Sequence, residues 1–300
     1  MYPIRHGVAR LLESERFESS TAARSIRESF SREWGHFDYE EDRTWGETVA
    51  QRRIDFLRHV DHDAEELRGK TVLDAGCGNG MLSHAISTFG CEVVATDLSE
   101  SVEAAHRHLS GREPRRTHFF QSDLMHPALR PNSFDVIFCA GVLHHTPSTR
   151  GTFDQVVKAL AAGGTIFVWL YWDVSGLKPK LSEAVRRAVS PLPAPMKHAV
   201  VWALLPQSLL RQYIRSVRDG TGRAGRLNRR EVLVRMLDSY TPRYRWRHTP
   251  EEIHGWFREL GFTNIKTTER GPEGFGVAAR KPLTPAERAA PMVAAGATAD

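Results

Sequence analysis

The run Thr-Val-Leu-Asp-Ala-Gly-Cys-Gly-Asn-Gly at residues 71–80 constrains the fold more than any other part of this chain. An apolar stretch ends at Asp74, three glycines follow at alternate positions, and a helical pattern begins at Met81. A buried parallel strand that leads through such a turn into a helix N-terminus forms a site of nucleotide size. A dinucleotide-binding turn has the spacing G-x-G-x-x-G, whereas here the third glycine comes one residue early. The spacing D-x-G-x-G-x-G therefore argues against a dinucleotide site.

Strands and helices alternate after this turn, and this pattern predicts an α/β fold with a parallel sheet. Apolar β-type runs predict strands at residues 71–74, 91–96, 117–121, 134–139, 165–170, 263–269 and 274–280. Helical spacing predicts helices at about 81–89, 99–109 and 149–160, the second with Ser99 as N-cap. A last helix is expected to begin after Thr249, with Pro250 at its first position, and to end at Gly261.

The segments that flank the alternating pattern have helical apolar spacing. One helix is expected over residues 5–26 and another over 45–59, and prolines at 191, 193, 195 and 206 are expected to interrupt helices of the later segment. The pattern divides the chain into a helical leader (1–69), a core (70–173 and 249–281), a helical insert or acceptor lid (174–248) and a disordered tail rich in Ala, Pro and Gly (282–300).

Charge is distributed unevenly along the chain. The net charge is +5, but residues 174–248 contain 16 Lys and Arg against 4 Asp and Glu, and the rest contains 25 against 32. Such a basic segment favours an acidic acceptor or partner, with a solvated arginine-rich surface as the alternative. Residues 181–214 also mix apolar stripes with arginine, which is compatible with peripheral membrane contact.

Three unclustered cysteines fit a reduced, cytoplasmic protein and argue against a disulfide framework. No apolar run reaches the length of a membrane span, so we expect no transmembrane segment. The histidine pairs lack a third ligand at useful spacing, so no metal site is predicted. No feature of the sequence specifies an oligomeric state.

Polar residues follow several predicted strands at the edge where ligands of parallel sheets bind. Asp97 ends the second strand and can accept two hydrogen bonds from a ribose diol. Asp123 follows the third strand and can accept a hydrogen bond from an adenine amine, with Leu98 and Leu124 on either side of the ring. After the fourth strand comes the run Ala-Gly-Val-Leu-His-His at residues 140–145, which faces the same ligand.

Taken together, these motifs resemble those of class I S-adenosylmethionine (SAM)-dependent methyltransferases over residues 70–173 and 249–281. The resemblance implies a Rossmann-like, seven-stranded and mostly parallel sheet whose last strand is antiparallel. It implies SAM as cofactor and S-adenosylhomocysteine as product, with Asp97 on the ribose and Asp123 near the adenine. The cofactor would also contact the glycine turn and the loop after the fourth strand, through Asp74, Gly76, Cys77, Gly78, Gly80, Ala140 and Gly141.

The aromatic-rich run at residues 34–45 is similar to the leader of some bacterial small-molecule members of this family. In those members aromatic side chains of the leader close over the cofactor, and Tyr39 and Trp45 are the candidates here. An aromatic face near a sulfonium cation contributes about 0.5–2 kcal/mol. The alternative is that both side chains only pack the leader onto the core.

Methyl transfer to a hydroxyl group needs a base, and His144 and His145 are the candidates because imidazole titrates near neutral pH. In related sugar and small-phenol O-methyltransferases a histidine of this loop is the base, and His145, one residue deeper in the loop, is preferred. The alternative is that a histidine here only shapes the cofactor pocket. Aromatic residues after the fifth strand and where the insert rejoins the core are the candidates for the acceptor pocket: Tyr171, Trp172, Tyr240 and Tyr244.

The sequence therefore predicts a SAM-dependent methyltransferase that acts on a small-molecule acceptor, at oxygen and with a histidine base. One alternative is a methyltransferase that modifies RNA or tRNA, which the absence of a recognisable RNA-binding module in the sequence disfavours. Another is a SAM-binding protein that transfers no methyl group, such as a cyclase or a scaffold.

Overall fold

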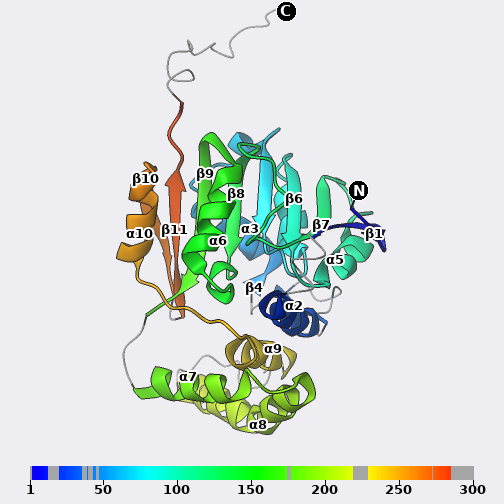
Figure 1. Cartoon of the computed structure of the whole chain (residues 1–300), viewed down its shortest axis with the longest axis vertical. Coiled ribbons are helices and arrows are strands. Elements are labelled where there is room, and N and C mark those ends of the chain that lie inside the picture. The colour runs from blue at the N-terminus through cyan, green and yellow to red at the C-terminus, as the bar shows by residue number, and fades with distance from the viewer. Residues whose placement is uncertain are drawn as a thin grey trace, which may run out of the picture.

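The computed structural model describes residues 2–12, 20–35, 39, 43–44, 47–173, 177–218, 229–271 and 273–284. Within these residues one mixed sheet has the strand order β1-β2-β7-β6-β5-β8-β9-β11-β10, and helices cover both of its faces (Figure 1). Its strands are β1 (Ile4–Arg5), β2 (Val8–Leu11), β5 (Thr71–Ala75), β6 (Glu92–Asp97), β7 (Thr117–Ser122), β8 (Phe134–Ala140), β9 (Leu160–Tyr171), β10 (Thr263–Arg270) and β11 (Gly274–Arg280). A separate small hairpin pairs β3 (Arg43–Thr44) with β4 (Glu47–Thr48).

The predicted α/β class and the seven strands β5 to β11 are present in the structure. Strands β7, β6, β5, β8 and β9 run parallel, and β11 lies antiparallel between β9 and β10, as the resemblance implied. The five parallel strands end at one edge of the sheet. This edge brings together the glycine turn, Asp97 and the loop that follows Ala140.

The sheet has nine strands because β1 and β2 extend it beyond β7, so the helix expected over residues 5–26 is a wrong prediction for its first part. Strand β2 pairs in parallel with β7, with Ala9 opposite Phe120. Val8 and Arg10 are both buried, and the Arg10 guanidinium donates to Gln121 Oε1 at 2.9 Å. This alternation of period two spans only four residues, too few to stand out from a helical stripe in the sequence.

The helices of the leader and the core pack on the two faces of the sheet. They are α2 (Thr21–Trp34), α3 (Val49–Val60), α4 (Met81–Ser87), α5 (Ser101–Leu109), α6 (Thr149–Val156) and α10 (Pro250–Glu259), with 3₁₀ turns η1 (Glu65–Leu67), η2 (Leu143–His145) and η3 (Val157–Ala159). Helix α10 has the predicted cap, because the Thr249 hydroxyl accepts a hydrogen bond from the Glu252 N–H at 3.3 Å. Ser99 is not the N-cap of α5, which Glu100 precedes without a side-chain cap.

The core has a layer on each face of the sheet. On one face the side chains of α6 and α10, including Phe153 and Phe257, pack against Leu73 and Ile137. On the other face α3 and α4 pack against strand residues of the opposite parity, such as Val72. Because alternate side chains of a strand point to opposite faces, burial on both faces explains why the strands are apolar throughout.

Three helices follow β9: α7 (Leu177–Val189), α8 (Ala194–Arg218) and α9 (Arg229–Tyr240). They lie beyond the carboxyl ends of the parallel strands, with α9 nearest to the sheet and to α2 (Figure 1). The helix break expected at Pro206 is a wrong prediction, since α8 continues through this residue. Pro206 is exposed. No helix of the described residues is long and apolar enough to cross a membrane.

Candidate functional site

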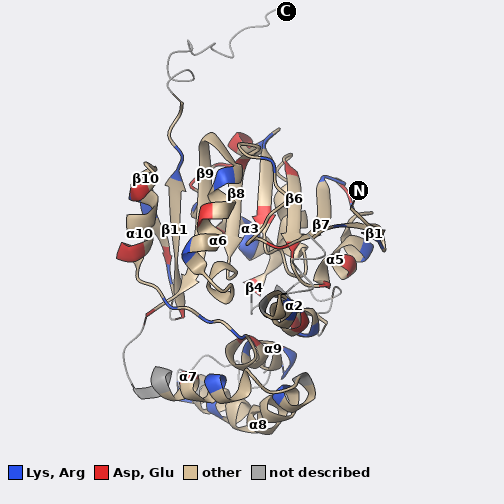
Figure 2. Ribbon diagram, in the orientation of Figure 1, with Lys and Arg blue, Asp and Glu red and all other residues tan. Residues whose placement is uncertain are grey.

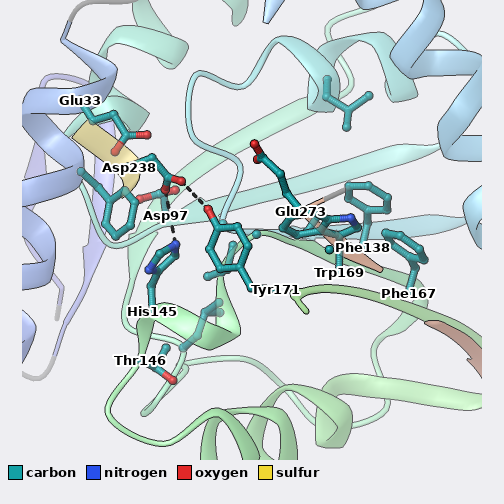
Figure 3. Close-up of a pocket in the computed structure, with 18 of the residues that line it drawn as sticks. Glu33, Asp97, Phe138, His145, Thr146, Phe167, Trp169, Tyr171, Asp238 and Glu273 are labelled. Carbon is teal, nitrogen blue, oxygen red and sulfur yellow. Dashed lines mark hydrogen bonds and ion pairs between the residues drawn. The ribbon is translucent and has the colours of Figure 1, made fainter. Parts of the chain in front are cut away.

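A cavity of about 580 Å³ lies at the carboxyl edge of the sheet, between the strand ends and the helices α2 and α9. Its floor is formed by the ends of β6, β8 and β9 and by the loops that follow them, and α3 forms one side. Figure 3 shows its carboxyl, imidazole and aromatic side chains converging from these elements. The cavity therefore lies where ligands of parallel α/β sheets bind.

The glycine turn between β5 and α4 lies against one end of this cavity and requires its glycines. Gly76 and Gly78 have φ of +90° and +54°, values that side chains with a Cβ rarely adopt. A Cβ on Gly76 would lie 2.1 Å from the Val142 side chain, and one on Gly78 would lie 2.5 Å from Trp34. The turn therefore closes against both the loop after β8 and the helix α2.

Asp97 ends β6 and lines the cavity. Its Oδ2 accepts a hydrogen bond from the Gly78 N–H at 3.0 Å, and its Oδ1 accepts one from the Ser99 N–H at 2.8 Å. A carboxylate oxygen has two lone pairs, so each oxygen can accept one further hydrogen bond. This arrangement fits a ribose diol held on a carboxylate that the backbone has already oriented.

The next part of the cavity fits a planar base. Leu98, Asp123, Leu124 and Met125 line it, and the Met125 N–H donates to Asp123 Oδ1 at 2.9 Å. Burial raises the pKa of Asp123, and this hydrogen bond partly opposes the rise. Apolar walls with one hydrogen-bond acceptor at the edge can hold a planar heterocycle, and the adenine site stays a prediction.

Arg52 of α3 lines the cavity on the side of the glycine turn, and the sequence did not identify it as a site residue. Within the described part of the chain no hydrogen bond or ion pair joins its guanidinium to another residue. Asp74 accepts a hydrogen bond from the Ser83 hydroxyl at 2.6 Å. Burial raises the pKa of Asp74 to about 6, and Ser83 and Arg52 partly oppose this rise. Arg52 is therefore a cation at the cavity wall that can bind a carboxylate ligand.

His145 forms the centre of a hydrogen-bonded group at the other end of the cavity (Figure 3). Its Nδ1 lies 2.9 Å from the Tyr244 carbonyl oxygen, so this nitrogen donates, and its Nε2 lies 3.4 Å from Asp238 Oδ1. The Tyr171 hydroxyl donates to the other oxygen of Asp238. Burial raises the pKa of Asp238, but the interaction with the His145 ring and the hydrogen bond from Tyr171 outweigh it and hold the pKa below its usual value.

Asp238 comes from α9, in the helical segment after β9, and the sequence did not identify it. The nearest signal in the sequence was the cluster of polar and aromatic residues that begins at this position. Asp238 is one of only four acidic residues among positions 174–248. A lone acidic residue in a basic segment is a feature that a search for catalytic groups could have used.

His144 lies behind this group and does not line the cavity among the described residues. It is fully buried, with its ring 4.3 Å from the rings of both His145 and Tyr171. Neither ring nitrogen has a hydrogen-bond partner among the described residues, and burial lowers its pKa well below the usual value. Of the two predicted candidates, His145 alone faces the cavity.

Glu33 of α2 presents a carboxyl group to the same cavity from the side opposite the strand ends. Only 1% of the residue is exposed, and neither carboxyl oxygen has a hydrogen-bond partner within the described chain. Burial raises its pKa well above the usual value, and the nearby charges of Asp238 and Asp97 raise it further. A buried carboxyl group without a partner is costly, so this group is suited to bind a ligand that donates hydrogen bonds.

The remainder of the cavity extends between α3 and the sheet and has aromatic walls. The His59 ring stacks on Phe167 at 4.6 Å, and Phe138 and Trp169 lie beside them. His59 Nε2 lies 3.3 Å from an oxygen of Glu269, whose pKa is raised by burial. Burial lowers the pKa of His59 to about 4. This part can hold a flat apolar group with polar contacts at its edge.

Several predicted residues lie elsewhere. Tyr39 stacks on His108 of α5 at 4.3 Å, and Trp45 lies outside the described residues. Of the four predicted acceptor residues, Tyr171 lines the cavity, whereas Trp172, Tyr240 and Tyr244 are not among its described lining residues. The Trp172 indole donates to the Gly271 carbonyl, and Tyr244 contributes only its carbonyl, to His145.

The predicted cofactor residues divide into two groups. Those that line the cavity are Gly76, Ala140 and Gly141, and those that support the turn without lining it are Asp74, Cys77, Gly78 and Gly80.

The chain has clear relatives among known proteins. Residues 73–166 match the family model described as "Methyltransferase domain". Over 114 residues, which are 37% of this chain and 46% of the relative, the sequence is 37% identical to the ubiquinone biosynthesis O-methyltransferase of Idiomarina loihiensis. Over 102 residues, 34% of this chain and 44% of the relative, it is 36% identical to the protein of the same name from Azoarcus sp.. The chain thus spans somewhat less than half the length of these curated relatives.

Solved structures with the same fold extend over most of the chain. The 1,6-didemethyltoxoflavin-N1-methyltransferase of Burkholderia thailandensis aligns with a TM-score of 0.52 and 17% identity, over 93% of this chain and 94% of that one. The magnesium protoporphyrin IX methyltransferase of Synechocystis PCC 6803 aligns with a TM-score of 0.51 and 15% identity, over 87% and 99%. At these identities the likeness concerns the fold alone.

Proposed function

We propose that this protein transfers the methyl group of SAM to an oxygen atom of a small organic acceptor, because residues 73–166 match the family model of a methyltransferase domain. The observation that carries the proposal is a single cavity with a cofactor end at Asp97 and Asp123 and a candidate base, His145, at the other end. The relatives named ubiquinone biosynthesis O-methyltransferase support oxygen as the methylated atom and a small molecule as the acceptor.

The residues of the cavity fit SAM. Asp97 has two oxygens with free lone pairs for the ribose hydroxyls, Asp123 can accept from the adenine amine, and Leu98 and Leu124 can cover the ring faces. Arg52 is a cation suited to the carboxylate of the methionine part. When bound, SAM supplies an electrophilic methyl group on a sulfonium, so the protein has to supply position, a dry site and a base.

His145 is suited to take the proton of an acceptor hydroxyl. The Tyr244 carbonyl fixes Nδ1 as a donor, which leaves Nε2 as the basic nitrogen. When Nε2 takes the proton, the Asp238 carboxylate at 3.4 Å stabilises the imidazolium that forms. The acceptor oxygen would then be a stronger nucleophile toward the methyl group that bound SAM would supply, while His145 holds the proton on Nε2.

The aromatic walls and the charges of the cavity bear on the acceptor class. The lining includes the side chains of Phe138, Phe167 and Trp169, which favour an aromatic or otherwise flat acceptor. Among the described residues that line the cavity, eight are Asp or Glu and three are Arg, so the charge of the cavity favours an acceptor with hydrogen-bond donors over an acidic one. The basic residues that suggested an acidic acceptor lie mostly outside this lining.

The test is the formation of S-adenosylhomocysteine with a panel of phenols, catechols and aminophenols. We expect turnover with some hydroxylated aromatic compounds, and a loss on the order of 10²–10⁴-fold for His145→Asn. The dissociation constant of SAM, measured by calorimetry, should stay within about threefold of wild type, because His145 lies at the acceptor end. Undiminished turnover of the variant would remove His145 as the base. Turnover of amines alone would move the reaction to nitrogen.

A further inference from the structure

Helix α8 has a long apolar face that no described residue covers. Its exposed side chains recur every three or four residues over most of the helix, and for the largest of them 48–57% of the residue is accessible. They are Met196, Ala199, Trp202, Ala203, Pro206, Leu210, Tyr213, Ile214 and Val217. We propose that this face docks the protein onto the surface of an anionic lipid bilayer, an activity that goes beyond methyl transfer.

The spacing of these residues gives a continuous stripe rather than scattered exposure. At 100° per residue the nine side chains fall within an arc of about 120°. The opposite side of the helix carries Val201 and Leu205, which pack on Val232 and Leu237 of α9. The helix is therefore apolar on two sides, one used in the fold and one open to solvent.

The charge of α8 and its neighbours selects the partner. Residues 194–218 contain no Asp or Glu, and Arg211 and Arg218 are exposed along one edge of the apolar stripe. Figure 2 shows Lys and Arg along α7, α8 and α9. An apolar stripe with basic residues beside it is complementary to anionic headgroups above acyl chains.

The length and polarity of α8 set the geometry of docking. Within the described residues no helix can span a bilayer, so α8 would lie in the plane of the interface. Trp202 and Tyr213 lie within the stripe, and both side chains favour the interfacial region. In Figure 1 α8 lies on the outside of the molecule, with α9 between it and the sheet.

Helix α9 connects the docking face to the cavity. It packs on α8 through Val232 and Leu237 and carries Arg235 and Asp238, which line the cavity. Docking through α8 would therefore bring the lid of the cavity next to the bilayer, where apolar acceptors concentrate. This last consequence rests on the proposed methyl transfer, whereas docking itself does not.

Vesicle sedimentation tests the proposal without SAM and without turnover. We expect wild-type protein to sediment with vesicles of phosphatidylcholine and phosphatidylglycerol, weakly with phosphatidylcholine alone, and less as salt is raised. The triple variant Trp202→Gln, Leu210→Gln, Ile214→Gln keeps the charge, and its partition coefficient should fall by at least about tenfold. The pair Arg211→Gln, Arg218→Gln should lose several-fold in the preference for anionic vesicles.

Leu260→Gln is the matched control. Leu260 is an exposed apolar residue at the end of α10, which Figure 1 shows well apart from α8, so this change should leave binding unchanged. Quenching of tryptophan fluorescence by brominated phosphatidylcholine in mixed anionic vesicles gives a second measure, which Trp202→Phe should reduce even if the triple variant folds poorly. Sedimentation of the folded triple variant at the wild-type level would overturn the proposal. So would a wild-type dimer that binds no vesicles and becomes monomeric in the triple variant, because the face would then join two copies.

Discussion

The strand edge (the carboxyl ends of β5, β6 and β8) and the helical cover (α2 and α9) line the same cavity, but they differ in how they hold a carboxyl group. At the strand edge both oxygens of Asp97 accept backbone hydrogen bonds, from Gly78 and Ser99. Under the helical cover both oxygens of Glu33 lack a partner among the described residues, and burial raises its pKa well above normal. At the strand edge the carboxyl group already has hydrogen bonds from the protein before a ligand binds, whereas under the helical cover it has none from the described residues.

This difference follows from how the two sides are built. Asp97, Gly78 and Ser99 belong to one strand end and one turn. Residues of these short segments therefore form this part of the site and also supply the hydrogen bonds of its carboxylate. Glu33 and Asp238 come from helices 205 positions apart in sequence, and only the tertiary fold brings them together. A carboxyl group that stays unpaired costs stability, and such a cost is characteristic of residues kept for ligand binding.

The largest expected effect tests the strand edge. In Asp97→Ala the ribose loses two hydrogen bonds to a charged acceptor, worth about 3–6 kcal/mol in total, so the dissociation constant of SAM should rise on the order of 10²–10⁴-fold. Calorimetry measures it. Asp97→Asn is the matched control, since it keeps the side-chain shape and one acceptor and should show a smaller loss. SAM affinity equal to wild type in the alanine variant would show that the cofactor does not lie on this carboxylate.

The sequence predicted the strand edge far better than the helical cover, for the same physical reason. Strand β5, its turn and Asp97 follow one another with fixed spacing, so a short motif specifies their geometry. The pairing of His145 with Asp238 depends on the path of α9, which no local pattern encodes. The N-terminal strands were missed because four residues of alternation resemble a helical stripe. The continuation of α8 through Pro206 was missed because the structure tolerates an exposed proline there.

The second prediction concerns the loss of folding stability caused by the unpaired carboxyl group of Glu33 in the helical cover. Glu33→Leu removes a buried carboxyl group without a partner, so the free energy of unfolding of the ligand-free protein should rise by about 1–3 kcal/mol at pH 7. The folded-state pKa of Glu33 is raised, so the unfolded chain ionises this group above about pH 4.3 while the folded chain stays protonated. Wild-type stability therefore falls with rising pH in that range, and the gain of the variant should be smallest below it.

Urea unfolding at pH 7 and pH 4 measures the gain. Ser29→Ala, also on α2, is the control for general changes of that helix, because it removes one hydroxyl that hydrogen-bonds Thr241 at 2.7 Å. A Glu33→Leu protein less stable than wild type at pH 7 would mean that Glu33 is satisfied in solution. The contrast with Asp97 would then disappear.

The smallest expected effect tests the aromatic wall of the cavity, at His59. Its pKa is lowered by burial to about 4 in the folded protein, whereas the unfolded chain takes up the proton below about pH 6.5. Stability from a neutral His59 is thus fully present above pH 6.5 and is lost as the pH falls toward 4, by about 1–2 kcal/mol at pH 5. His59→Phe keeps the stacking on Phe167 and cannot titrate, so its loss of stability between pH 7 and pH 5 should be smaller than that of wild type by this amount. Equal losses, measured by urea unfolding at both pH values, would mean that water reaches His59, and the wall between α3 and the sheet would then be open rather than dry.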